Sequence, residues 1–194
     1  MAGTDDPVVL IVEDEPDVAG TYEIWLEEAY EVRLAADGDE GLGRLDDSVD
    51  VVLLDRRMPG LSGDELLEQI REQGLDCRVA MVTAVDPDFD ILEMGFDTYL
   101  SKPVDADRLT ETVEALLARS EYDSLLREYY ALVEKRAALE ATKEDATLAE
   151  SEEYRRLTAE VEELRDRLSE TIGGIADDEE FIAAIRGVDD GGGG

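Results

Sequence analysis

The sequence contains no histidine and a single cysteine, Cys77, among its 194 residues. Zinc sites of the usual Cys/His kind, Ser-His-Asp catalysis and disulfide frameworks are therefore excluded. No apolar run approaches the roughly 18 residues that a membrane span needs. The acidic start lacks the basic and apolar regions of a signal peptide. We therefore expect a soluble, cytoplasmic protein with no membrane segment.

Lysine is also scarce, with only Lys102, Lys135 and Lys143 among 18 basic residues, against 52 acidic ones and a net charge of -34. Negative charges in such excess repel one another in dilute buffer, whereas about 1 M salt shortens the Debye screening length to roughly 3 Å. The acids are spread along the chain, which favours adaptation to a salty cytoplasm over a calcium store or a nucleic-acid mimic. A single Asp or Glu is therefore uninformative by itself.

Short β-branched, apolar runs alternate with segments of helical spacing between residue 7 and about residue 118. The runs cover residues 8–12, 32–35, 51–54, 79–83 and 98–100. Some are apolar throughout, as in strands that are buried on both faces of a parallel sheet. Five strands alternating with five helices predict an open, doubly wound α/β sheet for a first domain over 7–119.

Strand signals end after Arg119, and two apolar stripes with steps of three and four residues follow. They predict an α-helical hairpin over 120–173, with a turn at 141–151 and an end at Gly173-Gly174. The stripes are equally suited to pairing with a second chain. No proline or glycine interrupts 104–140, so the last helix of the first domain is free to continue into the hairpin. Residues 174–194 form an acidic, Gly-ending tail with a candidate short helix at 177–186.

Polar side chains stand at the ends of four predicted strands: Glu13 and Asp14, then Asp55, then Thr83, then Lys102. Carboxyl ends of parallel strands share one edge, where ligands bind. Clustered carboxylates need a cation, and hard oxygen ligands suit Mg²⁺. An ion beside a free carboxylate and a lysine holds a phosphoryl group. Asp55 is the natural nucleophile, because carboxylates form acyl phosphates.

Residues 8–118 resemble the receiver domain of two-component response regulators. The resemblance lies in VVLIVEDEP at 8–16, LLDRRMPG at 53–60, VTA at 82–84 and YLSKP at 99–103. It implies a flavodoxin-like fold with five parallel strands in the order 2-1-3-4-5. It also implies that Asp55 accepts a phosphoryl group from the phosphohistidine of a sensor histidine kinase.

The resemblance assigns roles to the residues at the strand ends. It implies that Mg²⁺ is held by Glu13, Asp14, Asp55 and the backbone carbonyl of Arg57. Lys102 would pair with the phosphoryl oxygens, and Thr83 would donate a hydrogen bond to one of them. The expected chemistry is then phosphoacceptance and autodephosphorylation rather than turnover of a separate substrate, so we do not expect an enzyme.

Tyr99 matches the aromatic switch residue of the family, which turns inward when Thr83 moves toward the phosphoryl group. Pro59 and Pro103 are expected to position their loops, and Pro103 follows a cis peptide bond in the family. The chain departs from the family in one respect. Only 19 positions separate Thr83 from Lys102, with Pro87 between them, so we expect a short fourth helix. The usual output face of helix four, strand five and helix five is then in doubt.

Residues 121–172 resemble the HalX domain of haloarchaeal regulators, through DSLLREYYALVEKRAALE at 123–140. The resemblance agrees with the halophilic composition. We predict a protein-interaction output through an apolar stripe made of Tyr122, Tyr129, Leu132, Tyr154, Leu157 and Val161. The partner of this stripe is another protein or a second copy of the chain, and a homodimer through the first domain is a further possibility.

Other functions remain to be weighed. A DNA-binding transcriptional output is disfavoured, because residues 121–172 carry 8 basic and 15 acidic side chains and DNA binding needs a concentrated basic face. A phosphatase of the haloacid dehalogenase type needs a second acid two residues after its nucleophile, where this chain has Arg57. A scaffold with an unphosphorylated receiver is a further alternative.

Overall fold

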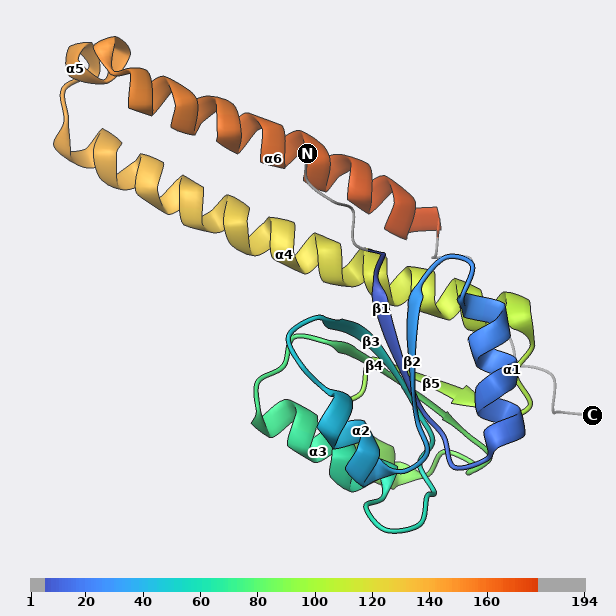
Figure 1. Ribbon diagram of the computed structural model, residues 1–194. Helices are drawn as coiled ribbons and strands as arrows, with labels where there is room; N and C mark the ends of the chain where they lie inside the picture. Colours follow the sequence, from blue (N-terminus) through green and yellow to red (C-terminus); the bar gives the residue numbers. More distant parts are fainter. Residues whose placement is uncertain (1–5, 178–194) are drawn as a thin grey trace, which may run out of the picture. The chain divides into compact units, whose positions relative to one another are not determined.

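The computed structural model describes residues 6–177. Its first part is a five-stranded parallel sheet in the order β2-β1-β3-β4-β5 (Figure 1), which confirms the predicted fold class. The strands are β1 (Val8–Val12), β2 (Glu31–Ala35), β3 (Val49–Leu54), β4 (Arg78–Thr83) and β5 (Thr98–Ser101). Every residue of β1 is buried, as expected for an inner strand covered on both faces.

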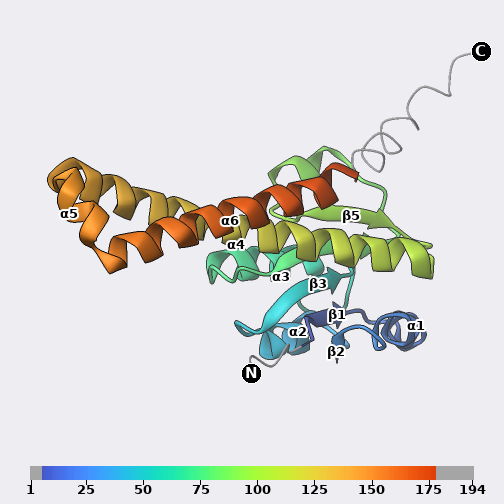
Figure 2. The same ribbon diagram turned by 90° about the horizontal axis from the view of Figure 1, so that it is seen from above.

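Helices cover both faces of the sheet (Figures 1 and 2). Helices α2 (Gly38–Arg44) and α3 (Gly63–Glu72) pack on one face, and α1 (Pro16–Leu26) and the start of α4 (Ala106–Thr142) pack on the other. Local signals fix where α2 and α3 begin. The Asp37 side chain accepts a hydrogen bond from the amide of Glu40, and Ser62 and Glu65 form a capping box.

The predicted alternation of five helices is wrong at one point. Between β4 and β5 the chain forms only a short 3₁₀ helix, η1 (Phe89–Glu93). The helix in this shortened connection is short, as predicted, but it is a 3₁₀ helix rather than an α-helix.

A charged network holds this shortened connection. The Arg71 guanidinium donates to the carbonyl of Gly95 at 2.6 Å, to the carbonyl of Cys77 at 2.9 Å and to Asp97 at 2.9 Å. Asp97 also accepts from Arg78 at 2.9 Å. Side-chain contacts from α3 and β4 therefore fix the end of a segment that lacks the packing of a regular helix.

Helix α4 continues without a break from Ala106 to Thr142, as the absence of proline and glycine allowed. Two compact units of the chain meet inside it, between Leu117 and Ala118. The second unit contains the rest of α4, the short helix α5 (Asp145–Glu150) and the long helix α6 (Glu152–Asp177). The expected turn at 141–151 thus contains a helix.

Helix α6 runs through Gly173 and Gly174, so the predicted end at this pair is wrong. A glycine ends a helix by adopting a left-handed conformation, but helical geometry is also open to it at a cost of about 1 kcal/mol. Most of the candidate helix at 177–186 lies outside the described residues.

The apolar stripes of α4 and α6 pack against each other inside the second unit. Their cluster consists of buried Leu125, Leu132, Val161, Leu164 and Leu168, with Tyr122, Leu126, Tyr129, Val133 and Leu157 packed against it. Tyr154 is half-buried, and its hydroxyl donates to Glu140 at 2.6 Å. The residues predicted as an output interface therefore lie in or beside the contact between two helices of one chain.

Within residues 6–177, no helix combines the length and the apolar character needed to cross a membrane.

Cys77 offers a probe of the opening of the first unit. Its side chain is 4% exposed, and burial raises the pKa of its thiol, so little reactive thiolate forms near neutral pH. We expect a chromogenic disulfide reagent to label the native protein only as fast as the protein opens, and to label it at once in denaturant. Rapid stoichiometric labelling under native conditions would contradict this burial.

Candidate functional site

Four strands deliver polar side chains to one edge of the sheet. The residues after the strands stay in register: the amide of Asp55 donates to the carbonyl of Val12 at 2.9 Å, and that of Lys102 donates to the carbonyl of Thr83 at 2.8 Å. The predicted residues Glu13, Asp14, Asp55, Thr83 and Lys102 thus lie at the carboxyl ends of β1, β3, β4 and β5.

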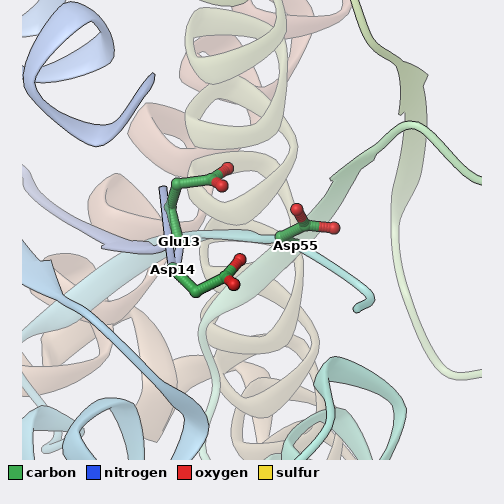
Figure 3. A group of neighbouring side chains, drawn as sticks. All are labelled: Glu13, Asp14 and Asp55. Carbon is green, nitrogen blue, oxygen red and sulfur yellow. The ribbon is translucent and has the colours of Figure 1, made fainter. Parts of the chain in front are cut away.

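Three carboxylates form the centre of the site. Glu13, Asp14 and Asp55 each offer an oxygen within 4.8 Å of the others, and Figure 3 shows their carboxyl groups gathered around a common space. Glu13 and Asp55 are buried, and Asp14 is half-buried. This all-oxygen donor set, partly open on the Asp14 side, fits the preferences of Mg²⁺.

Lys102 links two of these carboxylates. Its ammonium donates to Glu13 Oε2 at 2.6 Å and to Asp55 Oδ2 at 2.7 Å. Burial raises the pKa of Glu13 in spite of these contacts. Burial opposes the charge of Lys102, but hydrogen bonds to Asp55 and Glu13 outweigh it and raise the pKa of the ammonium. The Lys102–Pro103 peptide bond is cis, as the resemblance implied.

The loop after Asp55 supplies the other contact to its carboxylate. The amide of Arg57 donates to Asp55 Oδ1 at 3.2 Å. Arg56 forms a two-pronged ion pair with Asp64 on α3, at 2.9 and 3.1 Å. Pro59 lies in the same loop and lines a cavity of about 650 Å³ beside the site, together with Arg57 and residues from the β4–η1 connection.

The two predicted switch residues meet at Val85. Thr83 is buried, and its Oγ1 accepts a hydrogen bond from the Val85 amide at 3.3 Å. The Tyr99 hydroxyl donates to the Val85 carbonyl at 2.6 Å, and its ring packs near Phe96. Within residues 6–177, no hydrogen bond joins Thr83 Oγ1 to the carboxylates of Glu13, Asp14 or Asp55.

Sequence reasoning did not identify several residues that shape the site. Val85 carries no side-chain signal, because it acts through its backbone. Tyr22 of α1 is buried, its pKa is raised by burial, and it feels the charges of Lys102, Glu13 and Asp55. Tyr22 follows the helical spacing of core residues, which gives no sign of these charges.

Two family models match the chain. The response regulator receiver domain matches residues 9–114, and the HalX domain matches residues 118–185.

Curated relatives match well over half of the chain. A Haloferax volcanii protein, named as a candidate transcriptional regulator, is 58% identical over 137 residues, which are 70% of this chain and 24% of that protein. The alkaline phosphatase synthesis transcriptional regulatory protein PhoP of Bacillus subtilis is 36% identical over 118 residues, 58% of this chain and 49% of PhoP. The chain thus matches about a quarter of the first relative and about half of the second.

Solved structures show the same fold. A CheY-like receiver domain from Methanospirillum hungatei is 30% identical with a TM-score of 0.57, covering 60% of this chain and 98% of that one. TrrA from Thermotoga maritima, in complex with Mg²⁺-BeF, is 33% identical with a TM-score of 0.51, covering 57% and 99%. With its receiver model, its acidic strand ends and its sheet order, the chain belongs to the response regulators of two-component systems, as a receiver domain followed by a HalX domain.

Proposed function

We propose that Asp55 accepts a phosphoryl group from a sensor histidine kinase, and that this change is passed to a helical protein-interaction output. The observation that carries the proposal is the position of Lys102, whose ammonium bridges Glu13 and Asp55 at 2.6 and 2.7 Å. A lysine beside clustered carboxylates is suited to exchange one of them for an oxygen of an incoming phosphoryl group.

Each residue of the site has a proposed part in the transfer. Glu13, Asp14 and Asp55 would hold Mg²⁺, which when bound supplies positive charge to the phosphoryl oxygens. A carboxylate oxygen of Asp55 attacks phosphorus, the bond between phosphorus and the histidine nitrogen breaks, and its electron pair stays on the imidazole. Lys102 neutralises one phosphoryl oxygen, and Thr83 donates a hydrogen bond to another.

The contacts at Val85 suggest how phosphorylation of Asp55 would be transmitted from the site to the rest of the protein. Thr83 and Tyr99 hold the amide and the carbonyl of this one residue. Movement of Thr83 toward a phosphoryl group would disturb the Val85 amide, and the bond to Tyr99 would respond. In this proposal, Val85 couples the two predicted switch residues.

Phosphorylation by acetyl phosphate in about 2 M KCl, followed by intact mass spectrometry, tests the proposal. We expect one acid-labile phosphoryl adduct that requires Mg²⁺ and is missing from Asp55→Asn. Asp50→Asn serves as the control, because the Asp50 side chain lies outside the site and accepts a hydrogen bond from the amide of Val8 at 2.8 Å. A folded, Mg²⁺-binding wild-type protein that forms no adduct would instead support the scaffold alternative, or a requirement for the cognate kinase.

A DNA-binding output is the second candidate, because PhoP is named as a transcriptional regulatory protein. The ion pairs of the hairpin argue against a DNA-binding output. Arg156 pairs with Glu152 at 3.0 Å, Arg165 with Glu162 at 3.0 Å and Arg167 with Glu121 at 3.9 Å. Arginines neutralised in this way offer little to a phosphate backbone. We therefore favour a protein partner or a second copy of the chain, acting in the cytoplasm.

A further inference from the structure

The first helical residue of both α2 and α3 is a buried glycine, Gly38 and Gly63. Neither has the left-handed backbone conformation that glycine favours. Among the described residues, only Gly60 and Gly74 have positive φ, at +79° and +69°. The reason for glycine at 38 and 63 is therefore space rather than backbone conformation.

Both glycines lie against the loop that follows Asp55. A Cβ atom at Gly63 would stand 2.1 Å from the carbonyl oxygen of Asp55 and 2.9 Å from Arg56 Cα. A Cβ atom at Gly38 would stand 2.3 Å from the carbonyl oxygen of Leu61. Carbon and backbone atoms do not approach so closely, since their favourable contacts begin near 3.5 Å. A methyl group at either position must displace backbone.

This loop aims the carboxylate of Asp55. The Asp55 amide donates to the carbonyl of Val12 at 2.9 Å, and the Gly63 amide donates to the carbonyl of Arg56 at 3.1 Å. These two hydrogen bonds hold the loop on either side. Inside the loop, four residues before Leu61, the Arg57 amide donates to Asp55 Oδ1 at 3.2 Å. The position of Leu61 therefore helps to decide where the Arg57 amide lies.

We propose that Gly38 is a positioning residue of the ion site. Through the close approach of α2 to Leu61, it holds the loop over 56–62 where the Arg57 amide orients Asp55 toward Glu13 and Asp14. A methyl group at position 38 pushes Leu61 outward and weakens this amide contact. Asp55 then loses its alignment with the other two carboxylates. The inference rests on the proposed function, because it assigns Gly38 to the Mg²⁺ site.

The test compares Gly38→Ala with Gly43→Ala, which lies on the same helix but where a Cβ atom meets nothing within 4 Å. Both are made in a Gly20→Ala background, because alanine at such open helical sites stabilises the fold. Calorimetric titration with MgCl₂ should show an unchanged dissociation constant for Gly43→Ala. For Gly38→Ala we expect an increase of about 10- to 100-fold, the range typical of residues that support metal ligands.

Two further measurements separate positioning from mere stability. The amide resonance of Arg57 in the metal-free protein should shift in Gly38→Ala and not in Gly43→Ala. The Mg²⁺-induced rise in the unfolding midpoint, which needs only a partly folded population, should be smaller in Gly38→Ala. Equal Mg²⁺ affinities and Arg57 resonances in the two variants would overturn the inference alone. Failure of Gly43→Ala to bind Mg²⁺ would overturn the proposed function and the inference together.

Discussion

Replacing Lys102 with methionine should lower the free energy of unfolding by about 3–5 kcal/mol in Mg²⁺-free buffer, the usual effect of removing one partner of a buried ion pair. The Lys102 side chain is 13% exposed, and those of Glu13 and Asp55 are 2% and 9% exposed. Without the ammonium, two buried carboxylates face each other with no compensating charge. Methionine keeps most of the volume, so the loss reports charge rather than packing.

Urea unfolding, with and without Mg²⁺, measures this effect. Added Mg²⁺ should restore part of the stability, because a cation again lies among the carboxylates. Adding Glu13→Gln to the variant should also recover stability. Lys135→Met is the matched control, because Lys135 is exposed on α4 and its loss should cost less than about 0.5 kcal/mol. Equal stabilities for the two lysine variants would show that the Lys102 bridge contributes little.

The loss of unfolding free energy caused by Lys102→Met should depend on pH. Burial already raises the pKa of Glu13 in the wild-type protein, and loss of Lys102 raises it further. A carboxyl group with a raised folded-state pKa binds a proton more readily when folded, so its unfavourable contribution falls as the pH falls through that pKa. The stability difference between variant and wild type should therefore narrow toward acidic pH. A pH-independent difference would mean that Glu13 does not take up the proton.

Leu132→Ala should lower the free energy of unfolding of the helical unit by about 2–5 kcal/mol, as expected for a leucine removed from a packed contact. Leu132 is 9% exposed and belongs to the cluster between α4 and α6. Glu134→Ala, at an exposed position of the same helix, should change the stability by less than about 0.5 kcal/mol. Denaturant unfolding followed by hydrogen exchange at amides of residues 120–170 measures both.

Sedimentation of the same variants separates the two uses of the apolar stripe that the sequence left open. With a stripe packed inside one chain, Leu132→Ala destabilises the unit and leaves its association unchanged. A variant of normal stability that changes from dimer to monomer would show instead that the stripe joins two chains.

The sheet and the carboxylate site were predictable because their signals are local. A strand that is buried on both faces of a parallel sheet is apolar, so Val8–Val12 and residues 51–54 of β3 are easily recognised. The polar residue that follows such a strand must lie at the edge of the sheet. The sequence therefore predicts that Asp55 and Lys102 lie at the same edge, although 47 positions separate them.

The missed features are contacts between segments with no periodic relation. Arg71 reaches Asp97 from 26 positions away, and nothing in the spacing marks the pair among so many charges. Gly38 carries no signal in the sequence, because the carbonyl of Leu61 that excludes a side chain belongs to a distant loop. Helix α6 runs through Gly173, since glycine permits a helix end without requiring one.

The unbroken helix from Ala106 to Thr142 has a consequence for how such chains evolve by recombination. Where two modules are joined by a loop, residues are gained or lost at the joint with little effect. Where they share a helix, one inserted residue turns everything after it by about 100° around the axis. Seven inserted residues return it to within about 20°. A recombination that changes the length of this helix thus changes the helical phase of every residue after the joint.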